Sequence, residues 1–335
     1  DGVLLAGLLL LMATGLVVLF SASNASFARV GGQAVNMLVA LVVMWVFANI
    51  PPHILMRLSL PVYLLGLALL IGVALFGDIV NGARRWLNIG ITRIQPSELM
   101  KIAVPLMLAW YFDRYEATLK IRNYLVAAVL LLVPVGLILR QPDLGTATLI
   151  ASSGFFVLFL AGLSWKIIFG LGATGLASLP LLWSLMHDYQ RQRVLTLLDP
   201  AQDPLGAGYH IIQSTIAVGS GGLAGKGWMN GTQTHLDFIP ERTTDFIFAV
   251  FSEEFGLIGN LVLLAMFLLV IFRGLLITAE APTLFARLLA GAITLIFFTY
   301  AFVNMGMVSG ILPVVGVPLP LVSYGGTSLV TICLG

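Results

Sequence analysis

Charged residues and cysteines are scarce in this sequence. Asp, Glu, Lys and Arg make up 10% of its 335 residues and hydrophobic residues 59%, whereas a soluble domain has about a quarter charged residues. This balance excludes a soluble globular protein. The single cysteine, Cys333, excludes a disulfide framework and a cysteine metal cluster. The net charge of +2 does not point to nucleic acid, and we expect no such partner.

Metal-ligand spacing and internal repeats are also missing. His210 and His235 have Asp237 and Glu241 nearby, but their spacing fits no zinc motif. No period of about 20 to 50 residues stands out, which argues against a repeat architecture. We therefore expect no metal site built from protein side chains alone.

Long apolar runs take the place of these features. They are near-continuous and roughly 18 to 25 residues long, the length an α-helix needs to cross a membrane, so they do not predict a β-barrel. We expect an all-α polytopic membrane protein, a single integral membrane domain over residues 1–335 with about ten transmembrane helices. The predicted spans are residues 2–21, 33–50, 58–76, 97–114, 122–140, 144–162, 165–186, 246–272, 283–305 and 321 to the end.

Basic residues in the connections predict the orientation. With a cytoplasmic N-terminus, the inner connections carry Arg57, Arg114, Lys120, Arg122, Lys166, Arg273 and Arg287, against Arg29 and Arg140 outside. This follows the rule that positive charge stays inside. Two outer segments break the bias, residues 77–96 and the large extracytoplasmic loop at residues 187–245 between spans seven and eight. Their basic residues suggest an anionic ligand on the outer face, although each one alone is equally consistent with a solvated loop.

The carboxylate of Asp245 stands where the long polar loop meets an apolar helix. Removing it from water there costs free energy, so packing does not explain it. Glu253 and Glu254 lie about two helical turns further along, roughly 12 Å deeper, and they need a partner or a proton at that depth. These positions predict an internal polar site.

Other polar groups have two interpretations that the sequence leaves open. Glu98 and Lys101 share one helix face, as a buried ion pair that fixes packing or as part of a site. Asp143 either caps the sixth span or serves the site. Trp86 packs on a sugar or lipid, or anchors its loop at the membrane interface. The glycines between Gly219 and Gly227 bring backbone amides to a ligand, or are only flexible backbone, since they form no nucleotide-binding loop.

A set of motifs resembles the SEDS family, and the motifs occur in the family's order. They are Arg84-Arg85-Trp86-Leu87, Gln95-Pro96-Ser97-Glu98 with Lys101, Gln141-Pro142-Asp143-Leu144-Gly145-Thr146, Gly219-Ser220-Gly221-Gly222, Pro240-Glu241-Arg242-Thr243-Thr244-Asp245-Phe246-Ile247-Phe248, Glu253-Glu254-Phe255-Gly256 and Pro320-Leu321-Val322-Ser323-Tyr324-Gly325-Gly326. Residues 225–233 and 238–242 are more similar to the family's elongation branch than to its division branch. A histidine is usual at position 243 in the division branch and occurs in many members of the elongation branch, so Thr243 does not distinguish the branches, and it argues against any role that needs an imidazole there.

The resemblance implies a peptidoglycan glycosyltransferase that polymerises lipid II during cell elongation, with release of undecaprenyl diphosphate. Asp245 matches the family's essential aspartate, and we expect it to be the general base of an inverting transfer. Arg191, Arg193, Lys226 and Arg242 are candidates for binding the diphosphate, with Lys101 if a cavity reaches it. Trp86, Glu98 and Asp143 complete the predicted substrate-binding residues. A divalent cation, Mg²⁺ or Mn²⁺, could assist the leaving group, but no protein cage for it is visible.

The family also implies partners and a location. We expect a class B penicillin-binding protein, a transpeptidase, together with other elongation machinery proteins and membrane lipids. The location implied is the bacterial cytoplasmic membrane, with the active site on the extracytoplasmic side. A lipid II flippase is the alternative function, but it predicts inverted repeats and charge on both faces, and neither is clear. A purely structural scaffold would leave the interfacial Asp245 unexplained.

Overall fold

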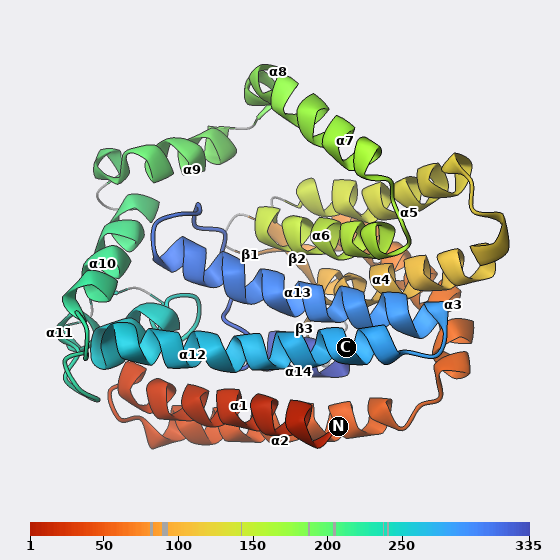
Figure 1. Cartoon of the computed structure of the whole chain (residues 1–335). Coiled ribbons are helices and arrows are strands. Elements are labelled where there is room, and N and C mark those ends of the chain that lie inside the picture. The colour runs from red at the N-terminus through yellow and green to blue at the C-terminus, as the bar shows by residue number, and fades with distance from the viewer. Residues whose placement is uncertain are drawn as a thin grey trace. The chain divides into compact units, whose positions relative to one another are not determined.

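The protein is almost entirely helical (Figure 1). The structure is a computed structural model that describes residues 1–80, 83–88, 93–141, 143–186, 188–203, 206–236, 238–239 and 241–335. The chain divides into two compact units, each described by itself below. The first contains Asp1–Ala34, Leu163–Leu269 and Tyr300–Tyr324, and the second Val35–Gly162, Val270–Thr299 and Gly325–Gly335.

The first unit combines apolar helices with the long polar loop of the sequence. Within its bounds lie α1 (Gly2–Ala22), α7 (Trp165–Ala177), α8 (Leu179–Leu185), α9 (Asp188–Leu198), the short η2 (Pro200–Gln202), α10 (Ala207–Ser220) and α11 (Thr232–His235). The first unit also includes the start of α2 (Phe27–Ala48), most of α12 (Ile247–Glu280) and the end of α13 (Leu284–Val308). The remaining parts of these three helices belong to the second unit. The predicted outer loop therefore contains helices of its own.

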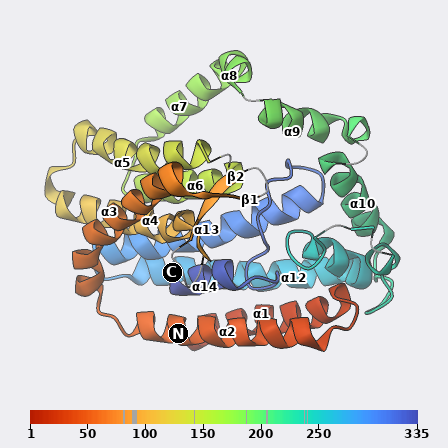
Figure 2. The same ribbon diagram turned by 180° about the vertical axis from the view of Figure 1, so that it is seen from behind.

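The second unit is built around α4 (Pro96–Arg114). Its other helices are α3 (Pro52–Phe76), η1 (Glu116–Thr118), α5 (Ile121–Leu139), α6 (Leu144–Leu160) and α14 (Gly326–Leu334). α4 packs against α3, α5, α6 and α14, and α3 and α5 lie beside it in Figure 2. Met100, Val104 and Phe112 of α4 are completely buried. This helix carries charged residues and is nevertheless enclosed by apolar neighbours.

The predicted membrane helices are present. Six helices of the described residues are long and apolar enough to cross a membrane: α1, α2, α3, α5, α12 and α13. The shorter apolar helices α6 and α7 coincide with two further predicted spans, and α4 and α14 coincide with the others. The chain is thus a multi-pass membrane protein, and the predicted all-α polytopic class is confirmed.

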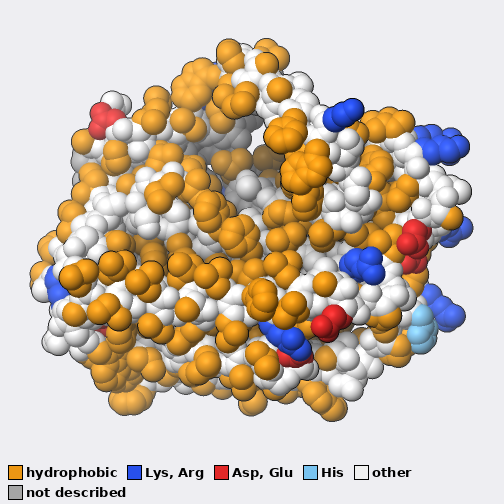
Figure 3. All heavy atoms as spheres, viewed as in Figure 1, with side chains coloured by type: hydrophobic (Ala, Val, Ile, Leu, Met, Phe, Trp, Pro, Cys, Tyr) orange, Lys and Arg blue, Asp and Glu red, His pale blue; other side chains and the backbone are white. Residues whose placement is uncertain are grey.

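Apolar side chains also cover much of the protein surface. Figure 3 shows them over most of the visible face, with charged side chains few and scattered. Leu38 of α2, Leu125 of α5 and Phe272 of α12 are each more than 60% exposed. A soluble monomer rarely exposes large continuous apolar patches, whereas lipid tails solvate them without cost.

Local sequence explains where several helices begin. Asp1 Oδ1 accepts a hydrogen bond from Leu4 N at 2.8 Å, and Asp143 Oδ1 caps α6 by accepting from Thr146 N at 3.1 Å. Pro52 and Pro96 stand in the first turn of α3 and α4, where a missing N–H costs no helical hydrogen bond. The interpretation of Asp143 as a helix cap is therefore confirmed.

Three segments differ from the sequence prediction. Residues 165–186, predicted as one span, form two helices, α7 and α8, which are separated at Ser178. The outer segment at residues 77–96 contains a small antiparallel sheet in the order β1-β2-β3, formed by β1 (Asp78–Val80), β2 (Ala83–Asn88) and β3 (Arg93–Ile94). The span predicted from residue 321 begins only at Gly326, because the backbone before it is not helical: Leu321 has a left-handed φ of 64° and Gly325 a φ of 160°. These strands and this extended segment add to the helical class without changing it.

Candidate active site

Asp245 lies in a turn directly before α12, at residues 241–246, which we call the Asp245 turn. The carbonyl of Glu241 accepts hydrogen bonds from Thr244 N at 3.0 Å and from Phe246 N at 3.3 Å. Glu241 has a φ of 49°, a left-handed conformation that is uncommon for a residue with a side chain. The turn therefore folds back over Glu241 and brings its carboxylate beside that of Asp245.

The surroundings of Asp245 favour its protonated form. The side chain is half-buried and precedes the membrane-spanning residues of α12. Burial, the charge of Glu241 and a hydrogen bond with Glu241 together raise the pKa of Asp245 from 3.8 to about 7. A carboxyl group with this pKa can both accept and release a proton near neutral pH.

The glycine-rich segment, residues 219–227, joins its backbone to α12. α12 is interrupted at Gly256, which has a φ of 64°. Four hydrogen bonds replace those that the kink breaks: Leu257 N to Gly222 O at 2.9 Å, Ile258 N to Leu223 O at 3.1 Å, Lys226 N to Glu253 O at 3.0 Å and Gly227 N to Glu254 O at 3.0 Å. The glycines thus allow their own backbone to lie against the backbone of α12. The sequence had left open whether they bring amides to a ligand or are only flexible.

The close approach leaves no room for side chains at several of these glycines. A Cβ atom on Gly221 would lie 2.1 Å from Ser252 O, and one on Gly225 would lie 2.1 Å from Glu254 O. On Gly256 it would lie 2.3 Å from Gly225 N. Since these neighbours are backbone atoms that cannot rotate away, glycine is required at all three positions.

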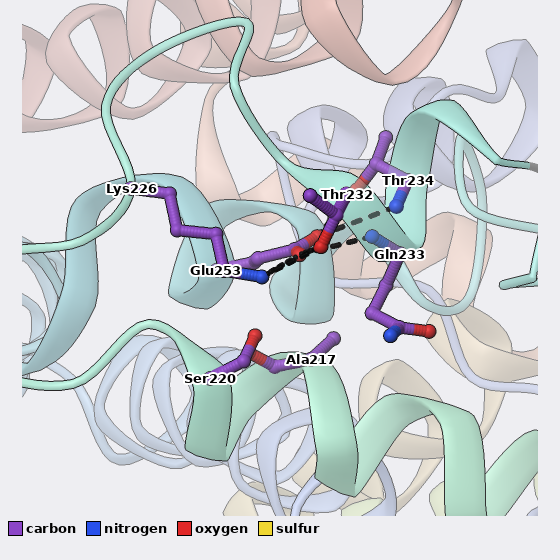
Figure 4. A network of polar contacts seen from close by, with 7 residues as sticks. All are labelled: Ala217, Ser220, Lys226, Thr232, Gln233, Thr234 and Glu253. Atoms are coloured by element: carbon purple, nitrogen blue, oxygen red, sulfur yellow. Dashed lines mark hydrogen bonds and ion pairs between the residues drawn. The ribbon is translucent and has the colours of Figure 1, made fainter.

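Glu253 is completely buried and is surrounded by hydrogen-bond donors. Lys226 Nζ lies 2.7 Å from its Oε1, which also accepts from Thr232 Oγ1 at 3.1 Å and Gln233 N at 3.0 Å. Its Oε2 accepts from Thr234 N at 3.3 Å and Thr234 Oγ1 at 3.2 Å. Figure 4 shows Lys226 and Thr232 directed toward the carboxylate, whereas the side chain of Gln233 points away and its backbone N–H makes the contact. The partner that the depth of Glu253 requires is thus present.

Glu254 has a separate partner. Its side chain is 1% exposed and its Oε1 accepts a hydrogen bond from Ser21 Oγ of α1. Trp228 Nε1 donates to Val17 O of the same helix at 3.2 Å. The glycine-rich segment, the start of α12 and α1 therefore form one connected part of the first unit.

The cations predicted to bind diphosphate have protein partners in the structure. Lys226 pairs with Glu253, and Arg242 Nη1 donates to the carbonyl of Thr234, so Arg242 is linked to the same network. Arg191 donates to the carbonyls of Trp183 and Ser184 at 2.9 and 2.7 Å, at the end of α8. The side chain of Arg193 lies outside the described residues. Their roles toward a ligand stay predictions.

The other predicted site residues belong to the second unit. Lys101 Nζ lies 2.6 Å from Glu98 Oε1, and the lysine is 6% exposed, so the expected neutralising pair is present. Asp143 caps α6 with Oδ1, and its Oδ2 lies 3.8 Å from Arg85 Nε. Trp86 is half-buried on β2. The two units thus each hold part of the predicted set.

Sequence reasoning missed several buried polar residues next to the Asp245 turn. Asn304 of α13 and Gln33 of α2 are both completely buried. Asn304 is an isolated amide within an apolar run, which is the signal that could have identified it. Ser323 was included in a motif but received no role.

No group of three or more His, Cys, Asp or Glu side chains in the described part of the chain could hold a metal ion. The divalent cation considered from the sequence would therefore need ligands from a substrate as well. Its participation stays a prediction.

Comparison with known proteins identifies the family. A family model described as "Cell cycle protein", covering FtsW, RodA and SpoVE, matches residues 2–335. A protein of Escherichia coli K12 named peptidoglycan glycosyltransferase MrdB is 53% identical over 336 residues, covering 100% of this chain and 91% of that protein. The chain belongs to the FtsW/RodA/SpoVE family, as the SEDS resemblance indicated.

Other relatives and solved structures agree. A peptidoglycan glycosyltransferase RodA of Treponema pallidum is 34% identical, covering 78% of this chain and 77% of that protein. A solved structure described as a peptidoglycan synthase complex that coordinates polymerization and crosslinking matches with a TM-score of 0.85 and 35% identity, covering 100% of this chain and 94% of that chain. The crystal structure of Thermus thermophilus RodA matches with a TM-score of 0.74 and 30% identity, covering 100% and 93%.

The first prediction concerns the glycine-rich segment. Gly225→Ala places a methyl group 2.1 Å from Glu254 O at a residue whose φ is 79°, so we expect it to destabilise the protein by about 1–3 kcal/mol or more. Gly219→Ala is the matched control, because a Cβ there meets nothing within 4 Å. Thermal unfolding of detergent-solubilised protein measures both variants. Equal midpoints for both would contradict the backbone contact.

The second prediction concerns Glu98 and Lys101. Glu98→Gln removes the carboxylate that neutralises the buried ammonium of Lys101, and Lys101→Met removes the cation beside Glu98; we expect each change to cost about 3–5 kcal/mol. Glu98→Gln with Lys101→Met removes both charges and should recover most of the thermal stability. Recovery of polymerising activity as well would favour a purely structural ion pair. A stable double variant without activity would instead show that the pair serves the reaction.

Proposed function

We propose that Asp245 is the general base of a peptidoglycan glycosyltransferase reaction that polymerises lipid II into glycan strands. Membership of the FtsW/RodA/SpoVE family over residues 2–335 supports the activity, as does the name of the 53% identical MrdB protein. The observation that supports the residue is its pKa of about 7, produced by burial and by Glu241. A general base works best when its pKa lies near the operating pH.

The reaction joins two lipid-linked sugars. The 4-hydroxyl oxygen of the acceptor sugar attacks the anomeric carbon of the donor sugar, and the bond from that carbon to the diphosphate breaks with inversion. Ionised Asp245 takes the hydroxyl proton as the new bond forms, and undecaprenyl diphosphate leaves with the electron pair of the broken bond. Asp245 then carries the proton, which it must release before the next transfer.

Positive charge near the departing diphosphate would stabilise the transition state. Arg242 is three residues from Asp245 in sequence and belongs to the same turn. A guanidinium group matches phosphate oxygens with two parallel hydrogen bonds, so Arg242 is the best candidate. Lys226 is a weaker one, because its ammonium already neutralises the buried Glu253. Trp86, Arg191, Arg193, Glu98, Lys101 and Asp143 complete the proposed substrate-binding set.

The proposed location is the bacterial cytoplasmic membrane, with Asp245 on the extracytoplasmic side. The distribution of basic residues in the connections supports this orientation. In this orientation, residues 187–245 form the large outer loop. It contains α9 and α10, and the glycine-rich segment begins at the end of α10. Lipid II presented at the outer surface would then reach the Asp245 turn without crossing the membrane.

A crosslinking partner is the second part of the proposal. The solved structure with a TM-score of 0.85 is described as a peptidoglycan synthase complex that coordinates polymerization and crosslinking. We propose that this chain likewise acts with a class B penicillin-binding protein, whose transpeptidase crosslinks the new strand. Other elongation machinery proteins complete the expected assembly.

The third prediction tests the general base. Asp245→Asn keeps the size of the side chain but cannot take a proton, so polymerisation of labelled lipid II in liposomes should fall by about 10²- to 10⁴-fold. Asp199→Asn, an exposed aspartate of the same outer loop, is the control and should retain full activity. Normal strand yield and length from Asp245→Asn would refute the assignment.

The same variants separate polymerisation from transport. Movement of lipid II across liposomes is measured under conditions where no strand is formed. If Asp245→Asn abolishes transport together with polymerisation, the flippase alternative gains support. Loss of polymerisation alone assigns Asp245 to the transfer reaction.

The fourth prediction concerns pH. Because only ionised Asp245 accepts the proton, the rate should rise with pH and level off above about 7. The negative charge of Glu241 raises the pKa of Asp245. Glu241→Gln removes this charge and should lower that pKa, so the increase in rate should occur at lower pH. Glu280→Gln, at the exposed end of α12, should leave the profile unchanged. A wild-type rate independent of pH between about 5 and 9 would contradict the proposal.

A further inference from the structure

Three successive carbonyl groups of the Asp245 turn are held by one other part of the first unit. The carbonyl of Thr243 accepts from Tyr324 N at 2.9 Å, and that of Thr244 accepts from Ser323 Oγ at 2.7 Å. The carbonyl of Asp245 accepts from Asn304 Nδ2 at 2.8 Å. The backbone from Thr243 to Asp245 is thus fixed by residues 304–324.

Asn304 has a central place in this arrangement. It lies near the end of α13, it is completely buried, and its Nδ2 also donates to Val317 O at 2.7 Å. One amide group therefore ties the Asp245 turn to the extended chain after α13. That chain passes close to the carboxylate, because a Cβ on Gly316 would lie 3.3 Å from Asp245 Oδ2.

Ser323 connects the same two segments a second time. Its Oγ donates to Thr244 O and accepts from Leu319 N at 2.8 Å. Its own carbonyl accepts from Gln33 Nε2 of α2 at 3.0 Å. Ser323 is 5% exposed and Gln33 is completely buried, so water is kept from the contacts with Leu319 and Gln33, while the contact with Thr244 is partly buried.

We infer that Asn304 is a positioning residue for the transfer reaction, which fixes the backbone of Asp245 and thereby the direction of its carboxylate toward the acceptor hydroxyl. This inference rests on the proposed role of Asp245 as general base. A hydrogen bond to the Asp245 carbonyl restrains the ψ angle of that residue, and two side-chain torsions then remain to place the carboxylate. Displacement of a catalytic group by about 1 Å can cost about 10²-fold in rate.

Burial makes the arrangement costly to change. If the amide is removed, the carbonyls of Asp245 and Val317 both lose this donor, the first in a partly buried contact and the second in a fully buried one. The turn must then move to find other donors, and Asp245 moves with it. An ordinary structural hydrogen bond elsewhere on α13 has no such link to the carboxylate.

The test compares Asn304→Leu with a control on the same helix. Leucine has a similar size but donates no hydrogen bond, so we expect a 10- to 100-fold lower kcat for lipid II polymerisation. The dissociation constant of lipid II and the KM should stay within threefold of wild type, since substrate binding does not depend on the base. Thr299→Val removes one buried hydrogen bond of α13, from Thr299 Oγ1 to Leu295 O, and should leave kcat unchanged.

Ser323→Ala keeps the test decisive if Asn304→Leu does not fold. It removes a single oxygen that bridges Thr244 O and Leu319 N, and a smaller loss of kcat with unchanged KM is expected. Rates are expressed per folded, monodisperse protein, so that a reduced folded fraction is not counted as slower turnover. If the folded variants have kcat values within threefold of wild type, the inference is refuted.

Asp245→Asn, measured in parallel, separates the general-base role of Asp245 from the positioning role of Asn304. An active Asp245→Asn enzyme would refute the general base itself. An inactive Asp245→Asn enzyme together with a normal Asn304→Leu enzyme would refute only the positioning role. A lower kcat in Asn304→Leu accompanied by a proportional rise in the dissociation constant of lipid II would show general damage to the site, and would also refute the positioning role.

Discussion

Buried polar groups in an apolar protein must have partners, and this constraint organises the first unit. Glu253 is completely buried, and an unpaired carboxylate there would cost more free energy than most folds can supply. Five donors from Lys226, Thr232, Gln233 and Thr234 surround it. To supply them, residues 226–234 must lie against the start of α12. The path of the loop thus follows from satisfying one carboxylate.

The kink in α12 allows the loop to reach this position. Where Gly256 interrupts the helix, N–H and C=O groups are released, and the glycine-rich segment forms hydrogen bonds with them on both sides of the kink. Thr234 connects Glu253 to the Asp245 turn. Its N–H and hydroxyl donate to Glu253, and its carbonyl accepts a hydrogen bond from Arg242 of the turn. A rigid network therefore adjoins the turn that carries the proposed base.

Hydropathy and local chemistry made much of this structure predictable. The apolar runs predicted the membrane helices, a helix cap was one of two interpretations of Asp143, and the spacing of Glu98 and Lys101 predicted their ion pair. The small sheet was not foreseen, because hairpin pairing within a polar segment has no hydropathy signal. The partners of the glycine-rich segment and of Asn304 were also missed, since they come from parts of the chain far away in sequence. Single amides in apolar runs indicate such contacts but do not identify their partners.

The contrast between two carboxylates explains why Asp245 rather than Glu253 suits proton transfer. The oxygens of Glu253 are occupied by donors, including an ammonium group, so its carboxylate is held for structure. Asp245 has a second carboxylate, Glu241, as its neighbour, and this repulsion adds to burial in favouring a bound proton. Its backbone is meanwhile fixed by three consecutive carbonyl hydrogen bonds. A fixed backbone with a carboxyl group that titrates near neutral pH combines the geometry and the proton affinity that a general base requires.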